Sequence, residues 1–91
     1  MKVFNEFLLD ADSSTEQTVY LPADSEVVNI IKTGEGIKLL VLAKYTGYDS
    51  QPPEIRKFKI CASDEIFYLN TVKYIGSFES SLGIRHVIET D

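Results

Sequence analysis

The stretch that decides the fold is EVVNIIKTGEGIKLLVLAKY, residues 26–45. Two runs rich in Val, Ile and Leu flank Gly34 and Gly36, and glycine supplies the positive φ that a tight reversal needs. The stretch therefore predicts a β-hairpin with strands at residues 26–32 and 37–45. Both alternating faces of residues 37–43 are apolar, which is typical of a strand covered on two sides. We expect this hairpin at the centre of the fold, with something packed on each face of its second strand.

Shorter runs of the same kind lie on both sides of the hairpin, separated by turn signals. They predict strands at residues 3–9, 16–21, 54–61, 71–78 and 84–89. Ser13 and Glu16 match a helix capping box, but the β-branched and aromatic residues that follow favour a strand. Residues 63–69 fit either one helical turn or a loop. Because the connections are too short for crossover helices, we expect an all-β, mainly antiparallel fold. Its form is a small sandwich or partly closed barrel of six or seven strands, with at most one short helical turn.

Length and composition set the class of protein. A chain of 91 residues corresponds to one domain, residues 1–91, and 44% hydrophobic residues with five Phe and five Tyr exclude a disordered chain. No apolar run approaches the roughly 20 residues of a membrane-spanning helix, and the first residues do not resemble a signal peptide. We therefore expect a cytoplasmic protein. So short a chain buries a limited core, so we also expect self-association.

The residues that carry chemistry are few. Cys61 is the single cysteine and His86 the single histidine, so the chain has no internal disulfide and no ordinary imidazole or thiolate metal site. A carboxylate site for Mg²⁺ or Ca²⁺ remains an alternative. We expect Cys61 to be a small core residue and His86 to be structural, on the same strand face as Ile84 and Ile88. No nucleophile elbow, phosphate loop or dinucleotide fingerprint is present. The sequence thus predicts a binding protein rather than an enzyme, with no catalytic residue, metal or cofactor.

Charge is unevenly distributed along the chain. The net charge of −5 argues against general binding to DNA or RNA. Residues 32–59 nevertheless hold six bases against three acids. Tyrosine can stack on a base or sugar while Arg and Lys hold phosphate. The candidate ligand-binding residues are therefore Lys44, Tyr45, Tyr48, Arg56, Lys57, Lys59 and Arg85. The alternative is a solvated strand face, in which Arg56 and Phe58 point inward and Lys57 and Lys59 outward.

Four short stretches carry a resemblance to a known family: residues 21–28, 54–60, 74–77 and 86–89. In these stretches the chain resembles a family of small uncharacterised proteins of tailed bacteriophages. The resemblance implies a β fold, a phage origin and the host cell cytoplasm as location. Where that family has a Thr-Gly turn after its fifth strand, this chain has Cys61-Ala62-Ser63-Asp64-Glu65.

The resemblance implies an accessory function. One such class sequesters the cyclic nucleotide signals of bacterial immunity without cleaving them, as homo-oligomers that hold the ligand near protomer boundaries. The alternative is a virion structural protein, or an interaction module that inhibits a host protein. Convergence of Tyr45, Arg56, Lys57 and Arg85 around a cavity would favour the nucleotide ligand. An exposed apolar patch without a basic pocket would favour the structural or protein-binding alternative.

Overall fold

A computed structural model describes residues 1–44, 51–65 and 71–91. The described residues form seven strands and no helix: β1 (Lys2–Leu9), β2 (Gln17–Leu21), β3 (Glu26–Lys32), β4 (Ile37–Lys44), β5 (Glu54–Ala62), β6 (Thr71–Ser80) and β7 (Gly83–Thr90). Each predicted strand is present, with its ends shifted by two residues at most where those ends are described. The all-β antiparallel fold class is confirmed. Part of the segment predicted as a helical turn or loop, residues 66–69, lies outside the described residues.

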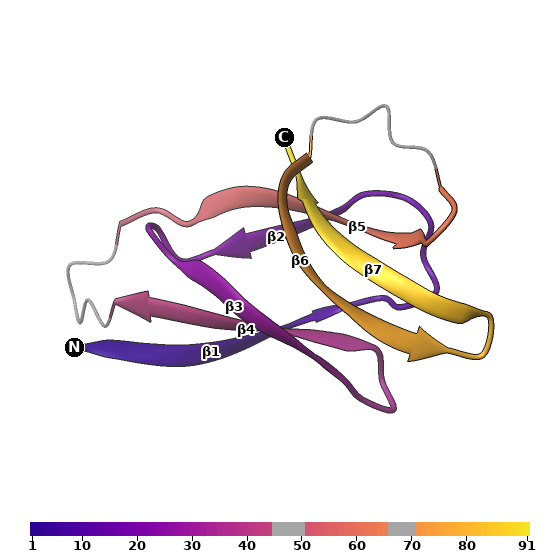
Figure 1. The fold of residues 1–91 in the computed structure, drawn as a ribbon. Coiled ribbons are helices and arrows are strands. Elements are labelled where there is room, and N and C mark those ends of the chain that lie inside the picture. The colour runs from indigo at the N-terminus through magenta and orange to yellow at the C-terminus, as the bar shows by residue number, and fades with distance from the viewer. Residues whose placement is uncertain (45–50, 66–70) are drawn as a thin grey trace.

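The strands pair into two antiparallel sheets (Figure 1). One sheet has three strands in the order β1-β4-β3, and the other has four in the order β2-β5-β7-β6. The described part of the molecule is 16 Å thick along its shortest axis, which fits two stacked sheets roughly 10 Å apart. The sheets do not join into a closed barrel among the described strands, so the architecture is a sandwich.

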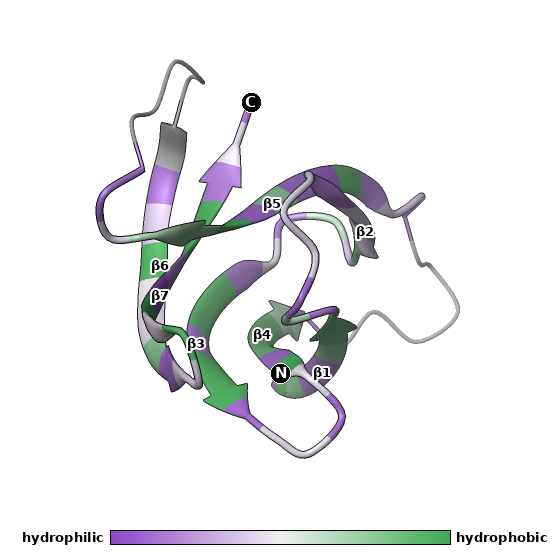
Figure 2. Ribbon diagram, turned by 90° about the vertical axis from the view of Figure 1, so that its right-hand side faces the viewer, coloured by the Kyte–Doolittle hydropathy of each residue, from purple (hydrophilic) through white to green (hydrophobic). Residues whose placement is uncertain are grey.

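The core lies between the two sheets. The three-stranded sheet contributes alternate residues of β4, among them Ile37, Leu39 and Val41, each 0% exposed. Phe58 of β5 and Val87 of β7 meet them from the four-stranded sheet. In Figure 2, β3 and β4 are hydrophobic along much of their length. Period-two alternation in the sequence is thus the direct cause of the two-layer core.

The sandwich is closed along one side, where β3 meets β6. Ile30 of β3 packs on Gly76 of β6, where an added Cβ would lie 3.2 Å from Cγ1 of Ile30. The Lys32 ammonium donates a hydrogen bond to the carbonyl oxygen of Glu79. These contacts leave β1, at the other margin of the three-stranded sheet, with β4 as its single neighbour among the described strands.

The predicted β3–β4 hairpin is confirmed, and Gly36 rather than Gly34 has the positive φ, at 151°. The expectation that both faces of β4 are covered is met on one face alone. Leu40 and Leu42 lie on the second face and remain half-buried, because the described residues place no layer there. We call this second side of the β1-β4-β3 sheet the outer face.

Candidate functional site

The predicted ligand-binding residues are distributed over both sheets. Lys44 ends β4 in the three-stranded sheet, whereas the Arg56, Lys57 and Lys59 side chains belong to β5 and Arg85 to β7 in the other sheet. Tyr45 and Tyr48 lie outside the described residues. Alternation along β5 turns Arg56 toward the core side and the two lysines to the opposite side. Among the described positions, Lys57 and Lys59 share one side of β5, and Arg56 and Lys57 border the same hollow from opposite sides of the strand.

Arg56 is engaged by the protein itself. Its Nε and Nη2 atoms donate to the two carboxylate oxygens of Glu89 on β7, both at 2.7 Å, and Nη1 donates to the carbonyl oxygen of Ser25 at 2.8 Å. The side chains of Arg56 and Glu89 are 16% and 10% exposed. The hydrogen bond to Glu89 raises the pKa of Arg56, because it favours the charged guanidinium. The guanidinium is thus already neutralised and joins β5, β7 and the β2–β3 turn.

A hollow of about 300 Å³ lies beside this ion pair. Its charged lining consists of Arg56 and Lys57 against Glu54, Glu89 and Asp91. Lys59 lies outside this hollow and contacts Glu65 at 3.6 Å. Since carboxylates outnumber the two cations and Arg56 is paired, this hollow does not favour an anionic nucleotide.

Arg85 lies far along the sheet from Arg56. It is opposite Ala62 at the last pair of the β5–β7 ladder, whereas Lys57 is opposite Thr90 at the first. Arg85 lines a separate hollow of about 80 Å³ with Asp12, Ser80 and Leu82. Convergence of Arg56, Lys57 and Arg85 around one cavity is therefore not seen among the described residues, and the role of these residues in ligand binding stays a prediction.

His86 forms a cluster that the sequence did not reveal. Its Nε2 lies 2.8 Å from Oγ of Ser63, in the turn after β5, and its Nδ1 lies 2.8 Å from the hydroxyl of Tyr74 on β6. The three side chains border a hollow of about 220 Å³ with Ala62 and Ile88. A serine next to an imidazole is the first contact of a nucleophile–base pair, but here a phenol stands where hydrolase triads have a carboxylate. Because both ring nitrogens have partners from neighbouring segments, the geometry supports a structural link across the sheet.

Cys61 is fully buried, as expected for a small core residue. Burial raises the pKa of its thiol to about 11, and a hydrogen bond with Glu65 adds to this effect. The thiolate is the reactive form of cysteine. Cys61 is therefore unsuited to nucleophilic or redox chemistry near neutral pH.

The most prominent surface feature among the described residues is the group of apolar side chains on the outer face. The outer face carries six apolar side chains from three adjacent strands: Phe4 and Leu8 of β1, Leu40 and Leu42 of β4, and Val28 and Ile31 of β3. Four of them are between 42% and 64% exposed. Val28 is the additional residue at a β-bulge between Val27 and Asn29, which places it on the surface. A contiguous patch of this kind is typical of an interaction surface.

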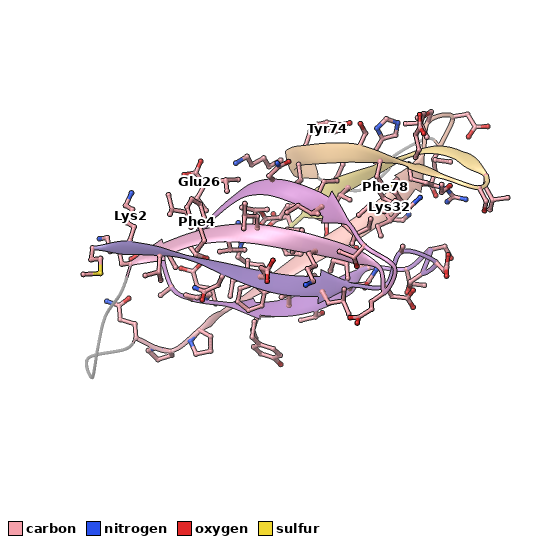
Figure 3. All side chains as sticks on the ribbon, turned by 90° about the horizontal axis from the view of Figure 1, so that it is seen from below. Lys2, Phe4, Glu26, Lys32, Tyr74 and Phe78 are labelled. Carbon is pink, nitrogen blue, oxygen red and sulfur yellow. The ribbon has the colours of Figure 1, made fainter. Side chains whose placement is uncertain are left out.

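Both positively and negatively charged residues lie on the outer face beside these apolar side chains. Lys2, Lys38 and Lys44 share the outer face with Glu6 and Glu26, which leaves the face at +1 in a chain of net charge −5. Figure 3 shows Lys2, Phe4 and Glu26 near one end of the sheet. Lys38 and Glu6 approach to 3.9 Å. Lys2 lies directly opposite Lys44. Like charges in this position destabilise a sheet.

Two further features are not seen in the part of the chain that is described. No cluster of three or more His, Cys, Asp or Glu residues there is arranged to hold a metal ion. Those residues also contain no helix with the length and apolar character needed to cross a membrane.

Comparison with known proteins shows no relationship. No protein-family model, no curated protein and no solved structure matches the chain. The resemblance to small phage proteins therefore stays a prediction, and functional inference rests on the geometry of the chain itself.

Proposed function

We propose that this protein is a non-catalytic structural module that assembles with copies of itself, and that a second copy covers the outer face. The observation that supports the proposal is that β4 carries apolar residues on both of its faces, whereas the described chain covers only one of these faces. A partner that packs on this face removes exposed apolar area from water. Such burial contributes a favourable free energy of roughly 25 cal/mol for each Å².

Charge favours a second copy as the occupant. The outer face is close to neutral, whereas the remainder of the chain carries the acidic excess. Copies therefore repel one another less when they meet through this face than through any acidic surface. Because the face holds both lysines and glutamates, two identical copies can place opposite charges against each other, as an isologous interface requires.

The experiment is a measurement of molar mass by light scattering and sedimentation over a concentration series. We expect the wild type to exceed the 10.3 kDa of one chain. Val28→Glu with Ile31→Glu adds charge at two exposed positions of the outer face and should raise the dissociation constant at least roughly tenfold, which corresponds to about 1.4 kcal/mol.

The matched control is Ile55→Glu. Ile55 is 64% exposed on the other sheet, so this variant introduces one charge of the same kind at an even more exposed apolar site. It should associate like the wild type. At about 1 mM protein, half of the chains are associated if the free energy of association is roughly −4 kcal/mol. A wild type that remains a monomer at this concentration would contradict the proposal.

A further inference from the structure

We infer that two copies also join edge to edge through β1, antiparallel, with Lys2 of each copy opposite Glu6 of the other and Phe4 opposite Phe4. This inference rests on the proposed self-association and specifies a second contact within the assembly.

β1 differs from the other edge strands. Among the described strands, β1, β3, β2 and β6 lie at sheet edges. The β3 ladder contains a bulge and the β6 ladder contains two register shifts, while β2 has five residues. β1 has eight residues in unbroken register with β4. Proteins commonly protect edges by bulges and short strands, and of these four strands β1 alone has neither device.

The hydrogen-bonding direction of β1 follows from the adjacent hairpin. The Thr33 N–H donates to the Gly36 carbonyl oxygen, so Gly36, and by alternation Lys38, turn their backbone groups toward β3. The alternate residues Ile37 and Leu39 then turn theirs toward β1. Their partners in β1 are its odd-numbered residues. Consequently Lys2, Phe4, Glu6 and Leu8 direct their backbone N–H and C=O groups to the open edge.

One antiparallel register suits these residues. With Phe4 on the two-fold axis, Lys2 of each copy faces Glu6 of the other copy. Three pairs of residues then exchange about six backbone hydrogen bonds. A shift of two residues in one direction places Phe4 opposite Glu6. A shift in the other direction places Lys2 opposite Phe4 and leaves Glu6 outside the ladder. The register centred on Phe4 therefore combines an aromatic pair with two opposite-charge pairs.

This register also relieves a conflict within one copy. Lys2 lies directly opposite Lys44, and the one ion pair of Glu6 among the described residues is the 3.9 Å approach to Lys38. A carboxylate from the second copy beside Lys2 offsets the repulsion between the two lysines.

Edge pairing further enlarges the outer face. Three strands about 4.8 Å apart and eight residues of about 3.3 Å each give roughly 400 Å² in projection for one copy. Two copies joined at β1 present one six-stranded surface of roughly 800 Å². A standard interface uses about 800 Å² from each partner. The edge contact thus brings the outer face to the size that a stable face-to-face contact needs.

The experiment is a charge swap followed by molar-mass measurement. Lys2→Glu and Glu6→Lys each place like charges across the proposed ladder, so each should raise the dissociation constant at least roughly tenfold. The double variant restores opposite charges and should associate within about threefold of the wild type. Lys57→Glu and Glu54→Lys make the same changes in net charge on the other sheet and should leave association unchanged.

A covalent probe gives a second readout. Residues in a hydrogen-bonded antiparallel pair have Cα atoms about 5.5 Å apart, within the range that a disulfide spans. Phe4→Cys should therefore form a disulfide-linked dimer under mild oxidation. Leu8→Cys, on the same strand and face but beyond the proposed ladder, should not. The buried native Cys61 does not compete.

The outcomes separate the two proposals. A monomeric wild type overturns both. A wild type that associates but is unaffected by Lys2→Glu and Glu6→Lys overturns edge pairing and leaves the outer-face proposal standing. Failure of the double variant to recover, or equal cross-linking at Leu8→Cys and Phe4→Cys, also overturns the edge register.

Discussion

The ion pair between Arg56 and Glu89 makes a quantitative prediction about stability. Arg56→Ala removes two charge-assisted hydrogen bonds of 2.7 Å and one of 2.8 Å to Ser25. The carboxylate of Glu89 then loses its cationic partner at a position where its side chain is 10% exposed in the intact pair. Removal of one partner of such a pair typically costs about 3–5 kcal/mol. Domains of this size have about 5–15 kcal/mol in total, so the variant should lose a large fraction of its free energy of unfolding.

A double-mutant cycle tests the physical reason. Arg56→Ala with Glu89→Ala removes both charges together, so no carboxylate stays buried without a partner. We expect the double variant to lose less than the sum of the two single losses, with a coupling of about 1–3 kcal/mol. Lys57→Ala, the next residue along β5 but with an exposed side chain, should stay within about 0.5 kcal/mol of the wild type.

The assay is equilibrium unfolding in urea at pH 7, followed by circular dichroism at one fixed protein concentration, because self-association adds to apparent stability. A loss below about 1 kcal/mol for Arg56→Ala, or strictly additive losses in the cycle, would refute the reasoning. The result also bears on the predicted nucleotide site. A charge reversal at Arg56 weakens the fold itself, so loss of ligand binding in that variant would not identify Arg56 as a ligand contact.

Two further predictions follow from single residues. The pKa of Cys61 is raised from 9.0 to about 11 in the folded chain, so the neutral thiol stabilises the fold below about pH 9 and this contribution, on the order of 2–3 kcal/mol, is lost as the pH rises through 11. A thiol reagent should therefore react slowly with the native protein at pH 7 and rapidly in urea, and equally fast labelling in both would show that Cys61 is accessible. Gly36→Ala should cost about 1–3 kcal/mol, because its φ is 151° and the new Cβ would meet the Leu9 carbonyl oxygen. Gly34→Ala is the control, with nothing within 4 Å of its added Cβ; equal urea midpoints for the two variants would contradict this reading.

Much of the fold could be predicted because its causes are local. Alternation along residues 37–43 and the glycine-bearing turn before them specify the β3–β4 hairpin, whose strand bounds were correct wherever they are described. The order β2-β5-β7-β6 could not be predicted. Pairing β5 with both β2 and β7 depends on which apolar faces fit together across the core, and no single stretch of sequence encodes that choice.

The predicted site shows why charge pattern alone misleads. Residues 32–59 are basic along the chain, but alternation already placed Arg56 on the face of Phe58. A charged side chain on an inward face requires a buried partner, and Glu89 supplies it. The cluster of Ser63, Tyr74 and His86 left no comparable sequence signal, because its three side chains come from separate segments that the sheet register alone brings together.

The expectation that both faces of β4 are covered is not met by a single chain, and this difference is the most informative one about function. A central strand with apolar residues on both faces is typical of a sheet buried on two sides. Leu40 and Leu42 occupy positions where a solvated sheet commonly carries polar residues such as threonine. Leu40 and Leu42 are half-buried beside Phe4 and so expose apolar area to water, while register shifts interrupt the edge strands β3 and β6 and β1 remains regular. Both departures lie on the same three-stranded sheet, and the proposed assembly accounts for both, because copies of the chain would supply a second layer and a neighbouring strand.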